Sequence, residues 1–332
     1  MTGPGNVMVA EAPEPPPQDG EVLVEMTSWG LCAGDVAAFK GTNLAVRYPL
    51  TLGHEGVGVV RTAPEQSAFT PGTYVIVIPS LTCGRCAACL AGRENHCPHL
   101  VVMGVGDPNG LFRDVVSVPA GQLLALPARV AETFGALIEP AAIAVHIVGR
   151  TPVADRAVVV FGTGVTGILS GQVAAHLGAR VTVVDKVAGR AAIAAEVGLD
   201  DFVLNDGVDL AGKLMAGRSG FDVVIDTVGS GELAAVATTV LRPGGVIVAV
   251  AAPTAGAQLT VDYGAVYRKE LSLVASRNYT RADFREAIAL LDAGQIDPRP
   301  LVTARLPLKE AGDALRMLAD RPENHVKILL ER

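Results

Sequence analysis

The strongest hydrophobic pattern in the chain runs over residues 157–185. Five consecutive apolar residues, Ala157–Phe161, predict a strand that is buried on both faces. Apolar residues then recur at helical spacing until Gly178, and residues 181–184 supply a second buried run. The pattern therefore predicts a strand, a helix and a second strand in direct succession.

A glycine motif connects the first of these strands to the helix. It comprises Gly162, Gly164 and Gly167 with Thr163, Val165 and Thr166 between them, spaced G-x-G-x-x-G. In such a motif the glycines allow a tight turn, a close approach of the backbone to a pyrophosphate, and close packing of helix on strand. The N-terminus of the helix favours the negative charge of that pyrophosphate. An ordinary glycine-rich turn is the alternative, but the strands, the helix and a following acid stand in register, which favours a dinucleotide site.

That acid, Asp185, ends the second strand 23 residues after Gly162 (185 − 162). A carboxylate there can accept hydrogen bonds from an adenosine ribose and repel a 2′-phosphate, which favours NAD over NADP. Lys186 and Arg190 soften the preference, because cations beside the ribose tolerate a phosphate.

Helices and buried strands continue to alternate after this unit. Strands are expected at Phe202–Leu204, 221–225, 246–250 and 271–275, and helices near 187–197, Leu210–Met215 and 233–241, with a turn at 242–245. The alternation predicts an α/β fold with a doubly wound parallel sheet. Thr280 and Asp283 are expected to cap a further helix, and the chain is predicted to end with a helix near 310–319 and a strand at 326–330.

The region before residue 150 is predicted to be rich in strands. Residues 21–26 alternate between polar and apolar, as a half-exposed strand does. A helix is expected to run through an apolar stretch to Val148. Glu139 lies among apolar neighbours at its start, so the carboxylate needs a partner. His146 in the same helix is interpreted as a packed, hydrogen-bonded histidine.

Four cysteines lie close together in the sequence, at Cys83, Cys86, Cys89 and Cys97. Glycine and alanine between them allow sharp reversals of the chain, so the four thiolates can close tetrahedrally round one zinc ion. Because a closed set of four leaves no position for a substrate, this metal is expected to be structural. Free thiols or a redox pair are the alternatives. His96 and His99 are not needed for the site and are expected at the surface.

A second set of metal-binding side chains comes from two separate places in the chain. Cys32, His54 and Glu55 offer a thiolate, an imidazole and a carboxylate, which suit a zinc ion with one coordination position left open. Taken singly, each residue also has a structural explanation. Cys32 is then a small core residue, His54 a hydrogen-bonded loop histidine and Glu55 a surface charge.

The composition is that of a soluble protein with two domains. The chain has 332 residues, of which 50% are hydrophobic and 18% charged, enough for two cores. A net charge of −7 implies no basic face and argues against a nucleic-acid partner. No basic start precedes an apolar stretch at the N-terminus, and the longest uncharged run, 157–179, is rich in glycine, so neither a secretory signal nor a membrane span is expected. We expect a cytoplasmic protein whose five cysteines stay reduced.

Together these motifs resemble the zinc-containing medium-chain alcohol dehydrogenases, nearly from end to end. Gly53-His54-Glu55, Ile138-Glu139-Pro140 and the downstream His146 are most similar to the polyol and sorbitol dehydrogenase branch. The resemblance implies a catalytic zinc ion on Cys32, His54 and Glu55, with Glu139 as a fourth ligand or bound through water. It also implies a structural zinc ion on the four clustered cysteines.

The same resemblance implies two domains and an assembly. A GroES-like, β-rich catalytic domain is expected from residues 1–148 and 275–332, with the structural zinc lobe at about 80–100. A Rossmann dinucleotide-binding domain is expected at 149–274, with the active site in the cleft between the two. Arg277 and Asn278 follow the last strand and are predicted to contact the cofactor; a surface ion pair of Arg277 is the alternative. Dimers or tetramers through the nucleotide domain are expected.

The sequence departs from the family at two places near the zinc ligands. Gly34 stands where the family usually has serine or threonine, and Ala37 where it often has histidine. The usual hydroxyl relay for the substrate proton is therefore missing, and we expect the proton to leave through water and Glu55 or Glu139. In addition, residues 1–9 start late relative to the family, so its typical first strand is expected to be shortened or absent.

The expected activity is the NAD(P)-linked interconversion of a secondary alcohol, such as a polyol, cyclitol or sugar derivative, and its ketone. Two alternatives remain open from the sequence. One is a zinc-free reductase of activated double bonds from the same superfamily. The other is a nucleotide-binding regulatory protein that has lost turnover.

Overall fold

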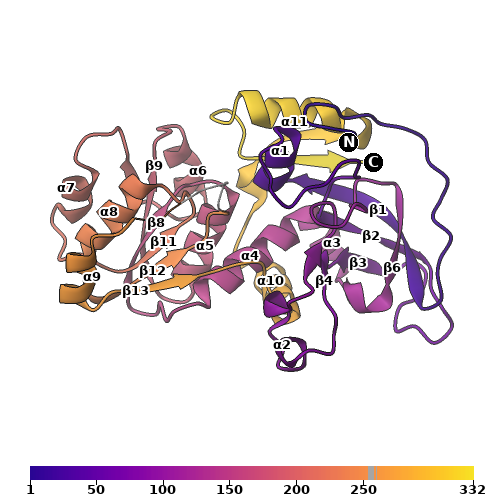
Figure 1. Ribbon diagram of the computed structural model, residues 1–332, viewed down its shortest axis with the longest axis horizontal. Helices are drawn as coiled ribbons and strands as arrows, with labels where there is room; N and C mark the ends of the chain where they lie inside the picture. Colours follow the sequence, from indigo (N-terminus) through magenta and orange to yellow (C-terminus); the bar gives the residue numbers. More distant parts are fainter. Residues whose placement is uncertain (253–257, 259) are drawn as a thin grey trace. The chain divides into compact units, whose positions relative to one another are not determined.

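The computed structural model describes residues 1–252, 258 and 260–332, which form two compact units (Figure 1). Unit 1 comprises Met1–Glu139, Thr280–Ala293 and Leu301–Arg332, and unit 2 comprises Pro140–Tyr279 and Gly294–Pro300. The division falls at 139/140 and 279/280, whereas the sequence suggested 148/149 and 274/275. Residues 294–300 belong to unit 2 because Gln172 donates to the main-chain oxygen of Asp297 (3.1 Å) and accepts from its N–H (2.7 Å).

Unit 1 is built on a seven-stranded sheet in the order β14-β15-β1-β2-β3-β7, with β6 also paired to β1. Its strands are β1 (Glu21–Leu31), β2 (Glu55–Thr62), β3 (Tyr74–Val77), β6 (Val115–Pro119), β7 (Leu123–Ala125), β14 (Val302–Pro307) and β15 (Lys327–Glu331). A second, two-stranded sheet joins β4 (Ser80–Leu81) to β5 (Val101–Val102). The two ends of the chain thus share one sheet, as the resemblance implied.

Helices and a buried tryptophan complete unit 1. The helices are α1 (Ala33–Phe39), α2 (Ala87–Leu90), α3 (Ala128–Phe134), α10 (Arg281–Asp292) and α11 (Ala311–Asp320), and 3-10 turns are η1 (Glu94–His96), η2 (Ala120–Gln122), η3 (Gly135–Leu137) and η5 (Leu308–Glu310). Helix α4 (Ile138–Val148) begins at the border of the two units, and η4 (Arg299–Leu301) crosses it again.

Trp29 is fully buried and donates from Nε1 to the main-chain oxygen of Leu111 (2.6 Å). Its ring fixes β1 at the centre of this core.

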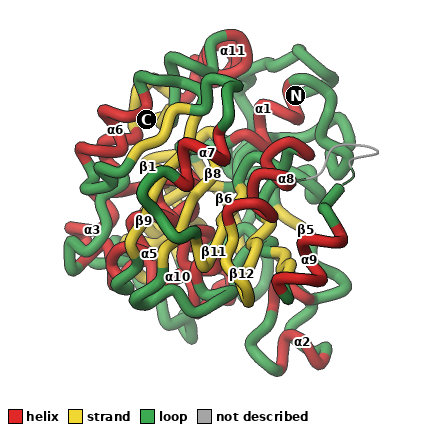
Figure 2. The backbone as a smooth tube through the Cα atoms, turned by 90° about the vertical axis from the view of Figure 1, so that its left-hand side faces the viewer, coloured by secondary structure: helices red, strands yellow, loops and turns green. Residues whose placement is uncertain are grey.

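Unit 2 has a six-stranded parallel sheet in the order β10-β9-β8-β11-β12-β13 among its described residues. The strands are β8 (Ala157–Phe161), β9 (Arg180–Asp185), β10 (Phe202–Leu204), β11 (Phe221–Asp226), β12 (Leu241–Ala249) and β13 (Ser272–Ala275). The helices between them are α5 (Val165–His176), α6 (Arg190–Glu196), α7 (Leu210–Met215), α8 (Gly231–Val240) and α9 (Tyr263–Lys269), which flank the strands in Figure 2. The predicted alternation and parallel sheet are confirmed.

Most predicted ends of elements agree with the structure. Gly178 follows α5 with φ +89°, and Thr280 with Asp283 forms a capping box on α10. The turn expected at 242–245 lies inside β12, where the pairing shifts register between Leu241 and Val246. Helix α9 was not expected, because no apolar residues recur at helical spacing along it. Its side chains are largely outside the core, and Tyr263 is 77% exposed.

The N-terminal residues form no strand ladder. Within residues 1–9 an isolated bridge joins Gly3 to Asn6, and the terminal amine donates to the main-chain oxygen of Leu50 (2.7 Å). The expectation of a shortened or missing first strand agrees with this.

One stretch among the described residues, Ala128–Val148, is long and apolar enough to cross a membrane by length and composition. It comprises α3, η3 and α4, and 72% of its most apolar 18-residue window is buried inside the structure.

Two glycines of the turn after β8 differ sharply in their surroundings, which allows a test of the fold. A Cβ on Gly167 would lie 1.8 Å from the main-chain oxygen of Gly162, whereas a Cβ on Gly164 would meet no atom within 4 Å. We expect Gly167→Ala to lower the stability of unit 2 by about 1–3 kcal/mol through overpacking. Gly164→Ala should cost about 1 kcal/mol or less. Thermal unfolding of both variants measures the difference, and equal melting temperatures would contradict this account of the turn.

Candidate functional site

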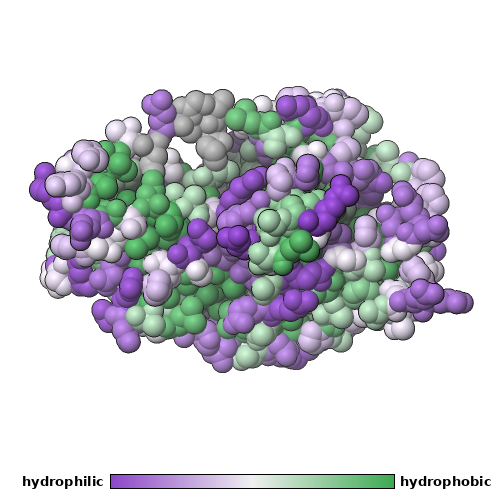
Figure 3. Space-filling model, turned by 60° about the horizontal axis from the view of Figure 1, so that its bottom comes forward, coloured by the Kyte–Doolittle hydropathy of each residue, from purple (hydrophilic) through white to green (hydrophobic). Residues whose placement is uncertain are grey.

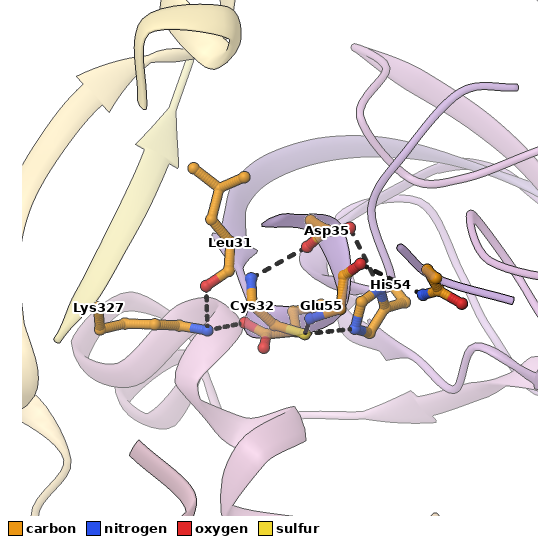
Figure 4. Close-up of polar contacts among 8 residues, drawn as sticks. Leu31, Cys32, Asp35, His54, Glu55 and Lys327 are labelled. Atoms are coloured by element: carbon orange, nitrogen blue, oxygen red, sulfur yellow. Dashed lines mark hydrogen bonds and ion pairs between the residues drawn. The ribbon is translucent and has the colours of Figure 1, made fainter. Parts of the chain in front are cut away.

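Pairing of β1 with β2 brings Cys32 and His54 together. Cys32 directly follows β1 and caps α1, His54 directly precedes β2, and the register pairs Gly30 with Glu55. The Sγ of Cys32 lies 3.1 Å from Nε2 of His54 (Figure 4). Their donor atoms and a carboxylate oxygen of Glu55 lie within 4.8 Å of one another. The three predicted ligands therefore converge, although 22 residues separate the first two.

Asp35, to which the sequence analysis assigned no role, supports this pair. The carboxylate is 1% exposed, and Oδ2 accepts from the N–H of Cys32 (3.0 Å), while Oδ1 faces Nδ1 of His54 at 3.5 Å. Burial alone would lower the pKa of His54, but the charges of Cys32 and Asp35 outweigh it and raise that pKa well above its usual value. Carboxylates in this position orient metal-binding histidines. In the sequence, the short spacing of Asp35 from Cys32 was the signal for this supporting role.

The donor set fits a zinc ion. A thiolate, an imidazole and a carboxylate are zinc ligands, and His54 would bind through Nε2, since Nδ1 faces the carboxylate of Asp35. A fourth position would stay open, which is typical of catalytic zinc sites.

Glu139 lies close to this site without joining the donor cluster. It is 5% exposed at the start of α4, and its charge contributes to the raised pKa of His54. It is absent from the group of donors that lie within 4.8 Å of one another in the described residues. Its role as fourth ligand therefore stays a prediction. His146, on the same helix, is half-buried.

Glu55 has a second partner that the sequence analysis missed. The Nζ of Lys327 forms an ion pair with Oε2 of Glu55 and also donates to the main-chain oxygen of Leu31 (3.0 Å). Lys327 is 1% exposed and lies on β15, within the apolar run of the C-terminal strand. A lysine in such a run was the only signal in the sequence.

The four clustered cysteines also converge, as predicted. Sγ of Cys83 lies 3.6 Å from Sγ of Cys97, Sγ of Cys86 lies 3.5 Å from Sγ of Cys89, and all four lie within 4.8 Å of one another. Strands β4 and β5 close the base of the loop. Hydrogen bonds from the N–H groups of Arg85 and Cys86 lower the pKa of Cys83 to about 6. The set fits a tetrathiolate zinc site.

His96 and His99 are exposed, as expected of residues outside this site. The four thiol groups come from a loop with little apolar packing of its own: Leu90 on α2 is 77% exposed. A metal at this place would therefore tie down the loop.

The glycine turn of unit 2 has the geometry of an anion site. Gly162 has φ +92°, and a Cβ on it would lie 2.5 Å from Oγ1 of Thr227. Gly164 is exposed at the N-cap of α5, where no side chain accepts from the first N–H groups. These N–H groups can bind an anion. Of the other predicted turn residues, Thr163 is buried, and Val165 and Thr166 are half-buried.

Asp185 holds the glycine turn through hydrogen bonds from Thr163. Its Oδ2 accepts from both N–H and Oγ1 of Thr163 (2.7 Å each), and Oδ1 accepts from the N–H of Val187 (3.0 Å). Arg190 is 8% exposed; burial lowers its pKa, and the charge of Asp185 opposes the shift. Lys186 is exposed.

The segment after β13 carries two polar atoms that lack hydrogen bonds to the described residues. They are Oγ of Ser276 and Nδ2 of Asn278, both buried at the atomic level. Asn278 has φ +54°, and Arg277 is exposed. Since the carboxyl ends of parallel strands are where such sheets bind ligands, this end of β13 is suited to a polar ligand.

Comparisons with known proteins agree with this geometry. Residues 18–128 match the family model described as alcohol dehydrogenase GroES-like domain, and residues 165–293 match the one described as zinc-binding dehydrogenase. The 2-dehydro-3-deoxy-L-galactonate 5-dehydrogenase of Pseudoalteromonas atlantica is 36% identical over 322 residues, covering 95% of this chain and 92% of that protein.

Two solved structures are also similar. An alcohol dehydrogenase of Escherichia coli CFT073 with NADH bound has a TM-score of 0.92 at 28% identity, covering 100% of this chain and 97% of that one. A zinc-binding dehydrogenase of Sinorhizobium meliloti 1021 bound to NADP has a TM-score of 0.91 at 29% identity, covering 99% and 96%.

Fold and site together define a two-domain oxidoreductase with a GroES-like unit and a Rossmann nucleotide-binding unit. The chain belongs to the zinc-type medium-chain alcohol dehydrogenases and is similar to their polyol dehydrogenase branch. Zinc and a nicotinamide cofactor are therefore its cofactors. The zinc-free reductase and the inactive regulatory protein are not favoured.

The two cysteine sites predict separate losses of metal. We expect Cys97→Ser to remove the zinc ion of the four-cysteine loop and lower the melting temperature, because the loop has little packing without it. Cys32→Ser should remove only the other zinc ion and abolish turnover. Elemental analysis and thermal unfolding provide the measurements. His96→Ala is the control and should keep the parent metal content; a loss in that variant would mean that the histidine is a ligand.

Proposed function

We propose that the protein interconverts a secondary alcohol of a polyol, cyclitol or sugar acid and the corresponding ketone, with NAD as hydride acceptor. The observation that carries the proposal is the convergence of Cys32, His54 and Glu55, with Asp35 behind the histidine. The sugar-acid substrate in the name of the Pseudoalteromonas relative supports the substrate class. A spectrophotometric screen of polyols, cyclitols and sugar acids with NAD and NADP, run beside a zinc count, tests it.

Each group of residues has a part in this reaction. A bound nicotinamide would accept a hydride from the alcohol carbon, and the loss of the hydroxyl proton would complete the ketone. Zinc, when bound, supplies a Lewis acid that lowers the pKa of the alcohol. Cys32, His54 and Glu55 would hold the metal, and Asp35 would keep the imidazole in the tautomer that presents Nε2. Gly162, Thr163, Gly164, Val165, Thr166 and Gly167 hold the pyrophosphate, with Asp185, Lys186 and Arg190 at the ribose.

Arg277 and Asn278 complete the proposed cofactor contacts. Asn278 offers a buried Nδ2 without a hydrogen-bond acceptor among the described residues, which suits a carbonyl or hydroxyl oxygen of a ligand.

The proton leaves through water and Glu55 or Glu139. No hydroxyl stands at position 34, where a Cβ would lie 3.3 Å from Sγ of Cys32 and 3.8 Å from Cε1 of His54. The nearby carboxylates of Glu55 and Glu139 are both buried and can accept a proton.

We expect Glu55→Gln or Glu139→Gln to change the pH profile of turnover and to lower kcat by about 100-fold. The affected variant is the one in which an amide replaces the carboxylate that accepts the proton. Steady-state rates across the pH range provide the measurement. Unaltered profiles in both variants would rule out this path for the proton.

The preference for NAD rests on Asp185. Asp185→Ala removes the carboxylate that would repel a 2′-phosphate, so we expect the ratio of kcat/KM for NAD to that for NADP to fall about tenfold or more. Glu196→Ala, at an exposed acid near the end of α6, is the control and should leave the ratio unchanged. A ratio that Asp185→Ala does not alter would show that another group selects the cofactor.

We propose further that the protein is a cytoplasmic homodimer or homotetramer associated through unit 2. Strand β13 ends the described sheet, and Leu273 on it is 53% exposed. Tyr263 and Tyr267 on α9 are 77% and 73% exposed. Figure 3 shows apolar residues gathered in patches on the face that it draws. Sedimentation of a variant with a charge at Leu273 tests the assembly.

A further inference from the structure

Unit 1 contains a cavity of about 340 Å³ between its seven-stranded sheet and the end of α3. Strands β1, β3, β14 and β15 contribute lining residues, and residues 131–135 form one wall. Among the described residues, the donors of the two cysteine sites are not part of this lining. Binding sites for small molecules commonly have volumes of about 300–1,000 Å³, so the cavity is large enough for one small molecule.

An irregularity in β1 supplies two hydroxyl groups to the cavity. The pairing of β1 with β2 shifts register between Met26 and Ser28, so Thr27 is an extra residue on β1. Neighbouring residues of a regular strand point to opposite faces of a sheet. Here both Thr27 and Ser28 line the same cavity. Bulges of this kind are frequent next to active sites, where they change the direction of a side chain.

Gly135 keeps the space beside Ser28 open. It has φ +50°, a backbone conformation that favours glycine, and a Cβ on it would lie 3.0 Å from Oγ of Ser28. A larger residue at position 135 would therefore crowd this hydroxyl group. A bulge in the strand and a glycine in the facing wall together shape the cavity.

The charged groups of the lining balance one another. Two guanidinium groups and two carboxylates line the cavity. Arg305 and Arg332 each form an ion pair with a glutamate, and Glu132 accepts from the hydroxyl of Tyr74 (2.7 Å). The described side chains of the lining thus carry equal numbers of positive and negative charges, which favours a neutral ligand over an anion.

The other lining groups suit a molecule with many hydroxyl groups. The hydroxyls of Thr27, Ser28 and Thr133 can each donate and accept, whereas carboxylates accept and guanidinium groups donate. Phe134 and Leu329 are buried and add apolar surface to the lining. A polyol has hydroxyl groups for the first set and C–H groups for the second.

We propose that this cavity is a second binding site, which takes one neutral polyol such as a hexitol or a cyclitol. The wall of residues 131–135 continues through η3 to the buried Glu139, so the bound polyol contacts the segment that leads to this acid. The inference goes beyond the proposed function, because no residue of the lining has a part in that reaction.

The test is calorimetric titration of the zinc-loaded Cys32→Ser protein, in which the metal site at Cys32 and His54 is disabled. We expect one molecule of sorbitol or myo-inositol to bind per chain with a millimolar Kd. Gluconate has a carboxylate at one end of a six-carbon chain and should bind no more tightly than sorbitol.

Variants made in this same protein locate the site. Thr133→Phe fills the cavity from α3 and should abolish binding. Thr239→Phe changes an exposed threonine on α8, outside the cavity, and should leave the Kd unchanged. Ser28→Ala and Thr133→Val each remove one hydroxyl without adding bulk, so each should weaken binding by about three- to tenfold.

Cys32→Ser protein that binds neither sorbitol nor myo-inositol would overturn the proposal. Unaltered binding in folded Thr133→Phe protein, or tighter binding of gluconate than of sorbitol, would also contradict it. If Thr133→Phe does not fold, Ser28→Ala and Thr133→Val decide, and an unchanged Kd in both would exclude this site. Failure of the proposed function looks different, because the parent protein would then oxidise no alcohol whatever the Cys32→Ser protein binds.

Discussion

The buried ion pair of Glu55 and Lys327 is the contact on which the organisation of unit 1 depends. It joins residues 272 positions apart, from the first part of the chain and from its last strand. A buried charge without a partner is strongly unfavourable, so the glutamate of β2 and the lysine of β15 stabilise each other in the core. In the strand order β14-β15-β1-β2, the C-terminal strand β15 pairs with β1 and so contributes to the same sheet as the first strands of the chain.

The donors at Cys32 and His54 illustrate how a metal site depends on residues that do not touch the metal. Asp35 orients His54 from one side, and Lys327 binds Glu55 from another. Gly30 leaves the space for the ion pair, and Gly34 leaves the space next to the thiol. The charges of Asp35 and Lys327 and the space at Gly30 and Gly34 thus surround the predicted ligands.

In unit 2, the glycines of the turn after β8 leave backbone N–H groups uncovered by side chains, so that an anion could reach them. Gly162 and Gly167 lie so close to their neighbours that no Cβ fits, whereas a Cβ on Gly164 would meet no atom within 4 Å. Asp185 accepts from the N–H and Oγ1 of Thr163 in the same turn, so the carboxylate that we predict to lie at the ribose also shapes the turn. Loss of Asp185 would therefore affect the turn as well as the choice of cofactor.

The sequence by itself determined the elements whose cause is local. Continuous apolar runs gave β8 and β9, Thr280 and Asp283 gave the start of α10, and cysteine spacing gave the four-thiol loop, because each depends on residues within a few positions. Tertiary structure alone decided the environment of the ligands. The partnership of Lys327 with Glu55 and the position of Asp35 behind His54 depend on strand pairing and on the shape of the chain around the site. A buried charge has no period and no fixed spacing to its partner, so only the folded chain shows which opposite charge lies beside it.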